Sequence, residues 1–492
     1  MSPAAVSVDT AFGTKRQIDQ SSCNQDFSCL KGFCPSFVTI DGVRPKKGTA
    51  AVDNENWPVL PNPALPATTT PWNLMITGVG GMGVITIGAL IGMAAHLDGK
   101  GVSALDMTGL AQKYGAVFSH LRIADHPEDI HAARIATGEA HALIGGDLVV
   151  SAGTEALSKM LAGKTRAVVS CTETPTAEFT QQRDWQFPQA GLQRRLLETL
   201  GEDAVQFIDA QHLASRLMGD ALFTNMLLLG YAWQKGLVPI SWPALEQAIR
   251  LNGSAVDANL EAFLWGRRAA VDPKKVAEIA GPLTGEAKPQ DSLEALIARR
   301  EAHLTAYQDA ALAQRYRQRV DAVQALGDPT LTRHVALQYA RLLAPKDEYE
   351  VARLYTDGEF MRQVNAQFEG DYRLSVHLAP PLFARPGPNG RPRKIRFGPW
   401  FWPVLRTLAG LRSLRGSWLD PFRFTAEKAV DRQLLADYEA DLDLLLHAAR
   451  TDANAHALAA WPAAVRGYGP VRQAAADQAR DERNALRKAL MA

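Results

Sequence analysis

Cysteine and unbalanced charge are both scarce in this sequence. Only four of its 492 residues are cysteine, which excludes a secreted scaffold held together by disulfides. The 53 Lys and Arg residues nearly balance the 52 Asp and Glu residues, for a net charge of +1. This balance excludes a polybasic nucleic-acid binder or an acidic tail protein over the whole chain, but not local patches. The N-terminus lacks the apolar region of a secretory signal, so we expect a soluble, cytoplasmic protein.

One long stretch lacks charge altogether. Residues 73–97 run for 25 positions without Asp, Glu, Lys or Arg. That length would suit a membrane-spanning helix. The stretch contains six glycines, however, and each costs a helix about 0.8–1 kcal/mol relative to alanine. A buried strand, a glycine turn and a buried helix explain these residues better, so we expect no membrane contact.

Apolar segments of strand length alternate with helical segments over residues 72–270. The expected strands are NLMITGV, GVSALDM, AVFSHLRIA, DLVVSAG, RAVVSC and VQFIDA, and GMGVITIGALIGMAAHL is an expected helix. This alternation predicts an α/β fold, with a doubly wound, mostly parallel, Rossmann-like sheet covered by helices on both faces.

Composition divides the rest of the chain. Residues 1–45 hold three of the cysteines, and residues 46–71 are a Pro-rich linker. After the α/β domain over 72–270, residues 271–345 have the composition and spacing of a helical connector. Residues 346–492 predict a helical, α+β C-terminal domain, which contains two strands joined by a turn around PGPNG.

Cys23, Cys29 and Cys34 fall within twelve residues, and Pro35 follows the last of them. Thiolates suit zinc or iron–sulfur, but zinc would want a further Cys or His nearby, and none is present. A Cys-Pro ending occurs in bacterial ferredoxin ligand runs. We therefore expect a metal site of the iron–sulfur type with an incomplete ligand set; the alternative is three unrelated buried thiols. Cys171 follows a predicted strand and is expected to be a small core residue.

The sequence Gly78-Val-Gly80-Gly81-Met-Gly83 follows a predicted strand and opens a predicted helix. Glycines let a backbone turn tightly and approach a phosphate, and the helix N-terminus offers unpaired N–H groups. A second predicted strand carries Asp106, 23 residues after Gly83, where a ribose-binding acid would sit. These residues favour dinucleotide binding. The alternative is a glycine turn that only packs a helix against a strand.

A polar loop follows Asp106 and carries Gln112 and Lys113. Because ligands of doubly wound sheets bind at the carboxyl ends of strands, these two side chains could reach a bound anion. His120 and Arg122 share one face of the next predicted strand. No paired carboxylate accompanies His120, so we interpret it as a hydrogen-bonded structural residue rather than a base. These motifs do not identify a catalytic residue.

Acidic residues are absent between Asp371 and Asp420. Basic residues interleaved with aromatic ones lie in the same stretch, among them Arg385, Arg391, Arg393, Lys394, Arg396, Arg406, Arg412 and Arg415. Such a region could dock an acidic protein, a phosphate-bearing ligand or nucleic acid. We favour the simpler interpretation, a solvated hairpin whose aromatic side chains pack between domains.

Several segments together resemble a known family. CNQDFSCLKGFCPSFVTIDG, the Pro-rich linker and ITGVGGMGVITIGALIGMAAHLDGKGVSALDMTGLAQKYGAVFSHLRIA are similar to the long, fused indolepyruvate ferredoxin oxidoreductases of bacteria. AIRLNGSAVDANLEAFLWGRRAA and DPFRFTAEKAVDRQLLADYEADLDLLL are similar too. Residues 72–270 resemble the gamma domain of 2-oxoacid:ferredoxin oxidoreductases. Residues from about 295 onward resemble the family's uncharacterised C-terminal domain.

The resemblance implies a CoA-dependent oxidative decarboxylation of an aryl-2-oxo acid such as indolepyruvate. In that family thiamine diphosphate with Mg supports decarboxylation, 4Fe-4S clusters pass electrons to ferredoxin, and CoA takes the acyl group. Cys23, Cys29 and Cys34 match the family's downstream cluster ligands. The gamma-type domain would help enclose the CoA or substrate side of the site.

The departures from the family are as informative. The chain lacks the thiamine diphosphate domains, the GDG of their Mg motif and the preceding CxxCxxC run. We therefore expect it to be inactive alone, because it lacks the cofactor that stabilises the carbanion. It would act as the C-terminal half of an oligomeric enzyme, with a thiamine diphosphate partner and ferredoxin, and without nucleic acid. The alternatives are a stand-alone NAD- or FAD-binding oxidoreductase and a non-catalytic, truncated remnant.

Overall fold

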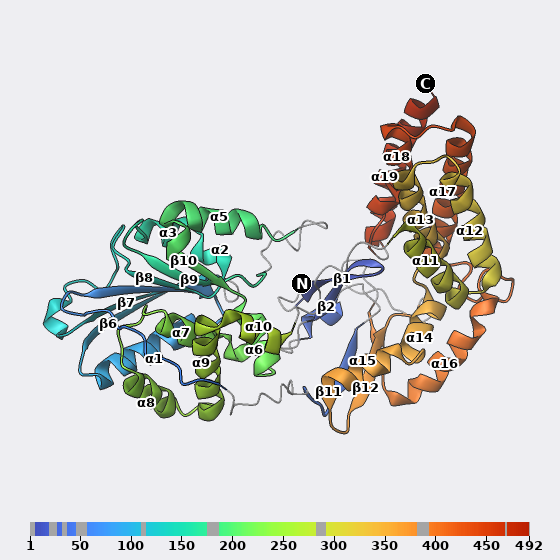
Figure 1. The fold of residues 1–492 in the computed structure, drawn as a ribbon. Coiled ribbons are helices and arrows are strands. Elements are labelled where there is room, and N and C mark those ends of the chain that lie inside the picture. Colours follow the sequence, from blue (N-terminus) through green and yellow to red (C-terminus); the bar gives the residue numbers. More distant parts are fainter. Residues whose placement is uncertain are drawn as a thin grey trace. The chain divides into compact units, whose positions relative to one another are not determined.

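The computed structural model describes residues 5–18, 27–31, 37–45, 57–109, 115–174, 186–281, 292–380, 393–467 and 470–491. The chain divides into two compact units, shown as a ribbon in Figure 1. Unit 1 comprises Met1–Gln25 and Lys47–Glu286, and unit 2 comprises Asp26–Lys46 and Ala287–Ala492. The expected cysteine-bearing segment, residues 1–45, is therefore shared between the two units.

A mixed sheet forms the centre of unit 1. Among the described residues its strand order is β10-β9-β8-β5-β7-β6. The strands are β5 (Trp72–Val79), β6 (Gly101–Thr108), β7 (Ala116–Ala124), β8 (Ala142–Gly145), β9 (Arg166–Ser170) and β10 (Val205–Ile208). β10, β9, β8 and β5 run parallel, whereas β7 is antiparallel to β5 and β6. The predicted α/β fold with a mostly parallel sheet is confirmed, and β7 separates β6 from β5.

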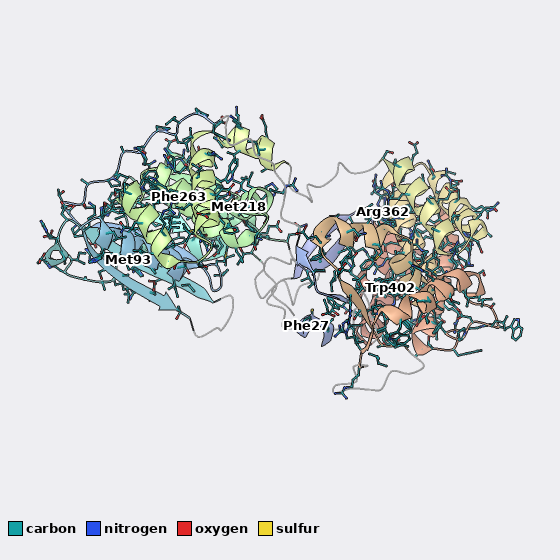
Figure 2. The ribbon with its side chains drawn as sticks, turned by 90° about the horizontal axis from the view of Figure 1, so that it is seen from below. Phe27, Met93, Met218, Phe263, Arg362 and Trp402 are labelled. Carbon is teal, nitrogen blue, oxygen red and sulfur yellow. The ribbon has the colours of Figure 1, made fainter. Side chains whose placement is uncertain are left out.

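Helices cover both faces of this sheet, as predicted. Side chains alternate along β5, so Leu74 and Ile76 pack into one core and Met75 packs into the other. The first core is lined by α1 (Val84–Leu97), α6 (Ala210–Leu217), α7 (Thr224–Gln234), α8 (Trp242–Asn252), α9 (Val256–Val271) and α10 (Pro273–Ala280). The second is lined by α2 (Leu148–Ser151), α3 (Thr154–Lys159) and α5 (Gln189–Leu200). Phe263 lies among the helices of the first core (Figure 2).

Shorter elements complete unit 1. They are the hairpin of β1 (Ala5–Thr10) and β2 (Gly13–Ile18) and the 3-10 turns η3 (Pro127–Asp129), η4 (Glu202–Ala204) and η5 (Ala221–Phe223). The uncharged run over 73–97 forms β5, the glycine turn and α1, as expected. Within the described ranges, no helix has both the length and the apolar character that crossing a membrane requires.

One predicted strand is wrong. The segment DLVVSAG forms α2, and the strand, β8, lies just before it. Asp147 begins α2 because its side chain accepts a hydrogen bond from Val150 N (2.8 Å), which satisfies an otherwise unpaired helix amide. A short apolar run alone does not distinguish a buried strand from a buried helix.

The Pro-rich stretch packs onto unit 1 where the structure describes it, over residues 57–71. Trp57 packs edge-on against Trp265 of α9, with ring centroids 5.9 Å apart. Pro61 O accepts hydrogen bonds from Gln234 Nε2 (2.8 Å) and Arg267 (3.3 Å). The stretch is extended, as expected of a linker, but it is also held against α7 and α9.

Unit 2 consists of a helical bundle and small sheets. One core joins α11 (Leu293–Tyr307), α12 (Ala310–Gln324), α13 (Pro329–Leu343), α17 (Ala426–Ala448), α18 (Ala453–Ala460), η9 (Trp461–Ala464) and α19 (Pro470–Met491). The expected connector over 271–345 is therefore divided, with α10 in unit 1 and α11–α13 in this bundle.

The sheets of unit 2 join segments far apart in the sequence. β12 (Arg373–Leu378) pairs antiparallel with β13 (Ile395–Phe397), which confirms the predicted pair of strands, and on its other side with β3 (Val38–Asp41). β11 (Phe368–Glu369) pairs with β4 (Arg44–Pro45). A second core joins this region to α14 (Glu348–Thr356) and α16 (Trp402–Gly410). The remaining elements are η1 (Ser28–Lys31), α15 (Glu359–Gln367), η7 (Pro399–Phe401) and η8 (Leu411–Leu414).

Candidate functional site at the carboxyl edge of the sheet

The parallel strands of unit 1 end at one edge of the sheet, where ligands of doubly wound folds bind. β5 leads into the glycine turn at residues 80–83, β8 into Gly146 and Asp147, β9 into residues 171–174, and β10 into Asp209. We call this edge, with the helix starts beside it, the carboxyl edge.

The glycine turn leaves the start of α1 without a side-chain cap. Gly80 N donates to Gly115 O (2.8 Å) and Met82 N donates to Val79 O (3.1 Å), which closes the turn. Gly83 is the N-cap residue of α1, with φ 67°, and it has no side chain that could accept a hydrogen bond. At Gly81, with φ 100°, no described atom lies within 4 Å of where a Cβ would stand. A helix start without a side-chain cap, and without a described atom near Gly81, suits an anionic group.

Packing explains the other two glycines that we predicted as ligand-binding. A Cβ on Gly78 would stand 2.8 Å from Val84 Cγ2. A Cβ on Gly83 would overlap Asn225 Nδ2 and stand 3.0 Å from Asn225 Cγ. Asn225, near the start of α7, therefore lies against the turn. Nothing in the sequence indicated Asn225, because it is far from the glycine motif along the chain.

Asp147 contacts the residue that leads into the glycine turn, and the sequence analysis did not identify it. It is fully buried, and its Oδ2 accepts a hydrogen bond from Val79 N (2.7 Å) while its Oδ1 accepts from Val150 N (2.8 Å). Burial raises the pKa of Asp147, and the backbone donors oppose that rise only in part. The side chain ties the end of β5 to the start of α2. The Gly-Gly-Asp sequence before an apolar run is a helix-start signal that could have identified it.

Hydroxyl groups line the edge at the ends of β9 and β10. Ser170 Oγ lies 3.1 Å from Thr172 Oγ1, which donates to Asp209 Oδ1 (2.8 Å). Asp209 also caps α6 by accepting from His212 N (3.1 Å). A cavity of about 340 Å³ opens beside β10, and its lining includes Asp209, His212 and Tyr231. In the strand order β10-β9-β8-β5, at least β8 separates these hydroxyls and this cavity from β5 and its glycine turn.

Asp106 does not lie where the dinucleotide argument placed it. In that fold the ribose-binding acid follows the strand next to the glycine-turn strand, but here β7 lies between β5 and β6. Asp106 is exposed on the edge strand, opposite Ser119 of β7. Ribose binding at Asp106 therefore loses its topological support. Gln112 and Lys113 lie outside the described residues, so their contact with an anion stays a prediction.

His120 is a hydrogen-bonded, buried residue, as interpreted from the sequence. Its Nδ1 accepts a hydrogen bond from Ile135 N (3.3 Å), which places the proton of the neutral ring on Nε2. Nε2 has no partner among the described residues. Burial, with the nearby charges of Arg134 and Lys159, lowers the pKa of His120. The imidazole is therefore kept neutral inside the domain.

The cysteines lie in different surroundings. Cys29 is on η1 and is half-buried, whereas Cys23 and Cys34 lie outside the described residues, so the cluster ligand set stays a prediction. Over the described ranges, no group of three His, Cys, Asp or Glu side chains is placed to hold a metal ion. Cys171 packs against the second core of unit 1, as predicted, and burial raises its pKa to about 11.

Comparison with known proteins identifies two regions. Residues 73–269 match the family "Pyruvate ferredoxin/flavodoxin oxidoreductase". Residues 293–485 match a family of unknown function (DUF6537). The first match lies within unit 1 and the second within unit 2.

Individual relatives match about two fifths of the chain. The chain is 29% identical over 202 residues to indolepyruvate oxidoreductase subunit IorB of Pyrococcus horikoshii, covering 40% of this chain and 96% of that protein. It is 27% identical to the Thermococcus kodakarensis IorB, with the same coverage. A solved keto/oxoacid ferredoxin oxidoreductase gamma subunit from Geobacter sulfurreducens is 20% identical, with a TM-score of 0.29, over 41% of this chain and 98% of that one.

Proposed function

We propose that this chain is a component of a 2-oxoacid:ferredoxin oxidoreductase, with residues 73–269 as its gamma-type domain, because these residues match the family "Pyruvate ferredoxin/flavodoxin oxidoreductase". The observation that carries the proposal is the match to nearly the whole length of an indolepyruvate oxidoreductase subunit. The reaction we propose is the CoA-dependent oxidative decarboxylation of an aryl-2-oxo acid, with ferredoxin as electron acceptor. The active enzyme would also contain a thiamine diphosphate-binding chain.

Within that enzyme, the carboxyl edge of unit 1 would hold the anionic part of CoA. The uncapped start of α1 and the open position at Gly81 provide amide N–H groups for a phosphate. Thr172 would add a hydroxyl, and Asn225 would hold the turn from the α7 side. Asp147 would act as a positioning residue, because it is fully buried and accepts hydrogen bonds from Val79 N and Val150 N.

An iron–sulfur cluster would pass single electrons from the oxidised substrate to ferredoxin. Cys29, on η1 of unit 2, is the described thiol that could ligate such a cluster. We propose that Cys23 and Cys34 supply two further ligands and that the thiamine diphosphate-binding partner supplies the remainder. A 4Fe-4S cluster takes four thiolates, so the three cysteines of this segment are insufficient without that partner.

Reconstitution with a partner tests the proposed function. The chain would be produced anaerobically alone and with a thiamine diphosphate-binding chain of the same enzyme class, and assayed with indolepyruvate, CoA and a viologen dye. We expect turnover and a four-iron absorption spectrum only in the combined sample. Turnover by the isolated chain would show that the thiamine diphosphate partner is not needed. An inactive, iron-free combined sample would contradict the redox assignment.

A charge placed at the glycine turn tests the CoA-binding role. Gly81→Asp should raise the KM for CoA about tenfold or more, because a carboxylate repels phosphate at the start of α1. Gly163→Asp is the matched control, since Gly163 also has positive φ (79°) and no described atom within 4 Å of its Cβ position. Equal KM values for CoA in both variants would contradict the proposal that CoA binds at the carboxyl edge. Saturable binding of NADH that Gly81→Asp abolishes would instead favour the nicotinamide alternative.

A further inference from the structure

One segment of unit 2 exposes large apolar side chains. It covers α16, η8 and the turn that leads into α17, residues 402–425. Trp418 is 80% exposed and Phe424 is 85% exposed. Val404, Leu411 and Leu419 of the same segment are also exposed. Large apolar residues gathered on one surface segment mark an interaction site more often than single ones do.

The same segment presents positive charge without exposed negative charge. Its acidic residue, Asp420, is buried and accepts hydrogen bonds from Tyr349 OH (3.1 Å), Gly416 N (2.8 Å) and Phe422 N (3.0 Å). Arg406 and Arg423 are exposed and Arg412 is half-exposed, and none of the three makes an ion pair within the described residues. Glu427, in the first turn of α17, is the next acidic residue along the chain.

Other cations of the basic stretch have partners within unit 2. Arg396 pairs with Asp41 of β3, and the Lys394 ammonium lies 4.9 Å from the centre of the Phe37 ring. Arg415 donates to Asp347 (2.7 Å) and is almost buried. The aromatic residues also differ in burial. Trp402 packs against Phe360 in the second core of unit 2, whereas the Trp418 side chain is exposed. These three cations have partners within unit 2, whereas Arg393 is exposed and Arg385 and Arg391 lie outside the described residues.

We propose that a set of exposed and half-exposed apolar and arginine side chains of residues 402–425, here called the Trp418 surface, docks an acidic protein. Its members are Val404, Arg406, Leu411, Arg412, Trp418, Leu419, Arg423 and Phe424. Unpaired arginines provide charge complementarity to carboxylates, and Trp and Arg are the residues that most often dominate protein–protein binding. Between residues 403 and 427 the chain has no lysine. Binding to nucleic acid or to an anionic membrane surface usually uses longer clusters of Lys and Arg.

Direct binding of an acidic protein tests the proposal. The full chain would be titrated with a purified acidic ferredoxin, chosen as probe because the proposed function names ferredoxin as acceptor. We expect saturable binding at 20 mM salt that weakens at 300 mM salt. Trp418→Ala and Arg423→Glu should each weaken it at least about tenfold. Lys488→Glu, an exposed cation on the last turn of α19, is the control and should bind like the parent chain.

Parallel titrations distinguish an acidic protein from nucleic acid and from an anionic membrane as the ligand of this surface. Absence of ferredoxin binding, or equal losses in Arg423→Glu and Lys488→Glu, would overturn the proposal. Tighter binding to a 20-nucleotide single strand or to phosphatidylserine vesicles than to ferredoxin would overturn it as well.

Viologen-linked activity of the reconstituted enzyme does not require docking of ferredoxin. Normal viologen activity without ferredoxin binding would refute the docking surface alone, whereas ferredoxin binding without viologen activity would refute the proposed function alone.

Discussion

The contact between α7 and α9 gives a quantitative prediction, because two glycines set how closely these helices approach. A Cβ on Gly266 would overlap Leu227 O and stand 2.7 Å from Tyr231 N, and one on Gly230 would overlap Phe263 O. Ordinary van der Waals contact begins at 3.4 Å, so the facing backbone at Tyr231 N must retreat by at least 0.7 Å. The colliding atoms belong to helix backbone, which cannot rotate away as a side chain does.

The expected loss of stability follows from two opposing contributions. Overpacking a core costs about 1–3 kcal/mol, and a backbone collision falls at the upper end. Alanine's higher helix propensity returns about 0.8–1 kcal/mol. Gly266→Ala should therefore destabilise unit 1 by about 2 kcal/mol. Because α7 carries Asn225 to the glycine turn, the same change should also disturb the carboxyl edge.

Urea unfolding of the full chain, followed by near-UV circular dichroism from the tryptophans of unit 1, measures the effect. Gly92→Ala is the matched control, since Gly92 is also inside a helix but has no described atom within 4 Å of its Cβ position. It should stabilise the protein by about 0.5–1 kcal/mol. If Gly266→Ala is as stable as Gly92→Ala, close approach of the two helices does not depend on glycine and the reasoning fails.

Two further predictions concern buried charge. Asp347→Ala should destabilise unit 2 by about 3–5 kcal/mol in thermal or urea unfolding, because it leaves Arg415 and Lys428 without their buried carboxylate. The control Asp443→Ala breaks an exposed pair with Arg319 and should lower the free energy of unfolding by under about 1 kcal/mol. Similar losses of stability in both variants would contradict the argument. The pKa of His120 is lowered in the folded protein, so its contribution to stability is present above the unfolded pKa of about 6.5 and is lost as the pH falls through the folded pKa. His120→Gln should therefore flatten the fall in unit 1 stability between pH 7 and pH 5, and an unchanged pH profile would show that His120 does not titrate as argued.

The Trp418 surface also bears on the region of unknown function. Residues 293–485 include the whole of the Trp418 surface and most of the helical bundle that supports it. If the proposed docking is correct, this region places an acidic protein near the rest of the enzyme. It would then have a binding role rather than a catalytic one.

Local pattern and composition determined much of this protein. The uncharged residues 73–97 predicted a buried strand, a glycine turn and a helix, and they form β5, a turn and α1, although Ile85 and Met93 of α1 are exposed. Period-two alternation identified β7, and helical spacing identified the bundle helices, because both patterns depend on neighbours in the chain. Likewise, the clustering of arginines without acids is visible in the sequence itself.

Only the tertiary structure decided which residues meet. Asn225 reaches the glycine turn because α7 packs beside α1, and Asp147 reaches Val79 N because β8 pairs with β5. Insertion of β7 between β5 and β6 moved Asp106 to the sheet edge, and no periodicity specifies strand order. Packing also decided which basic residues find a carboxylate partner, as Arg415 does at Asp347 and Arg396 does at Asp41. Contacts between distant segments depend on three-dimensional packing, which local sequence patterns do not encode.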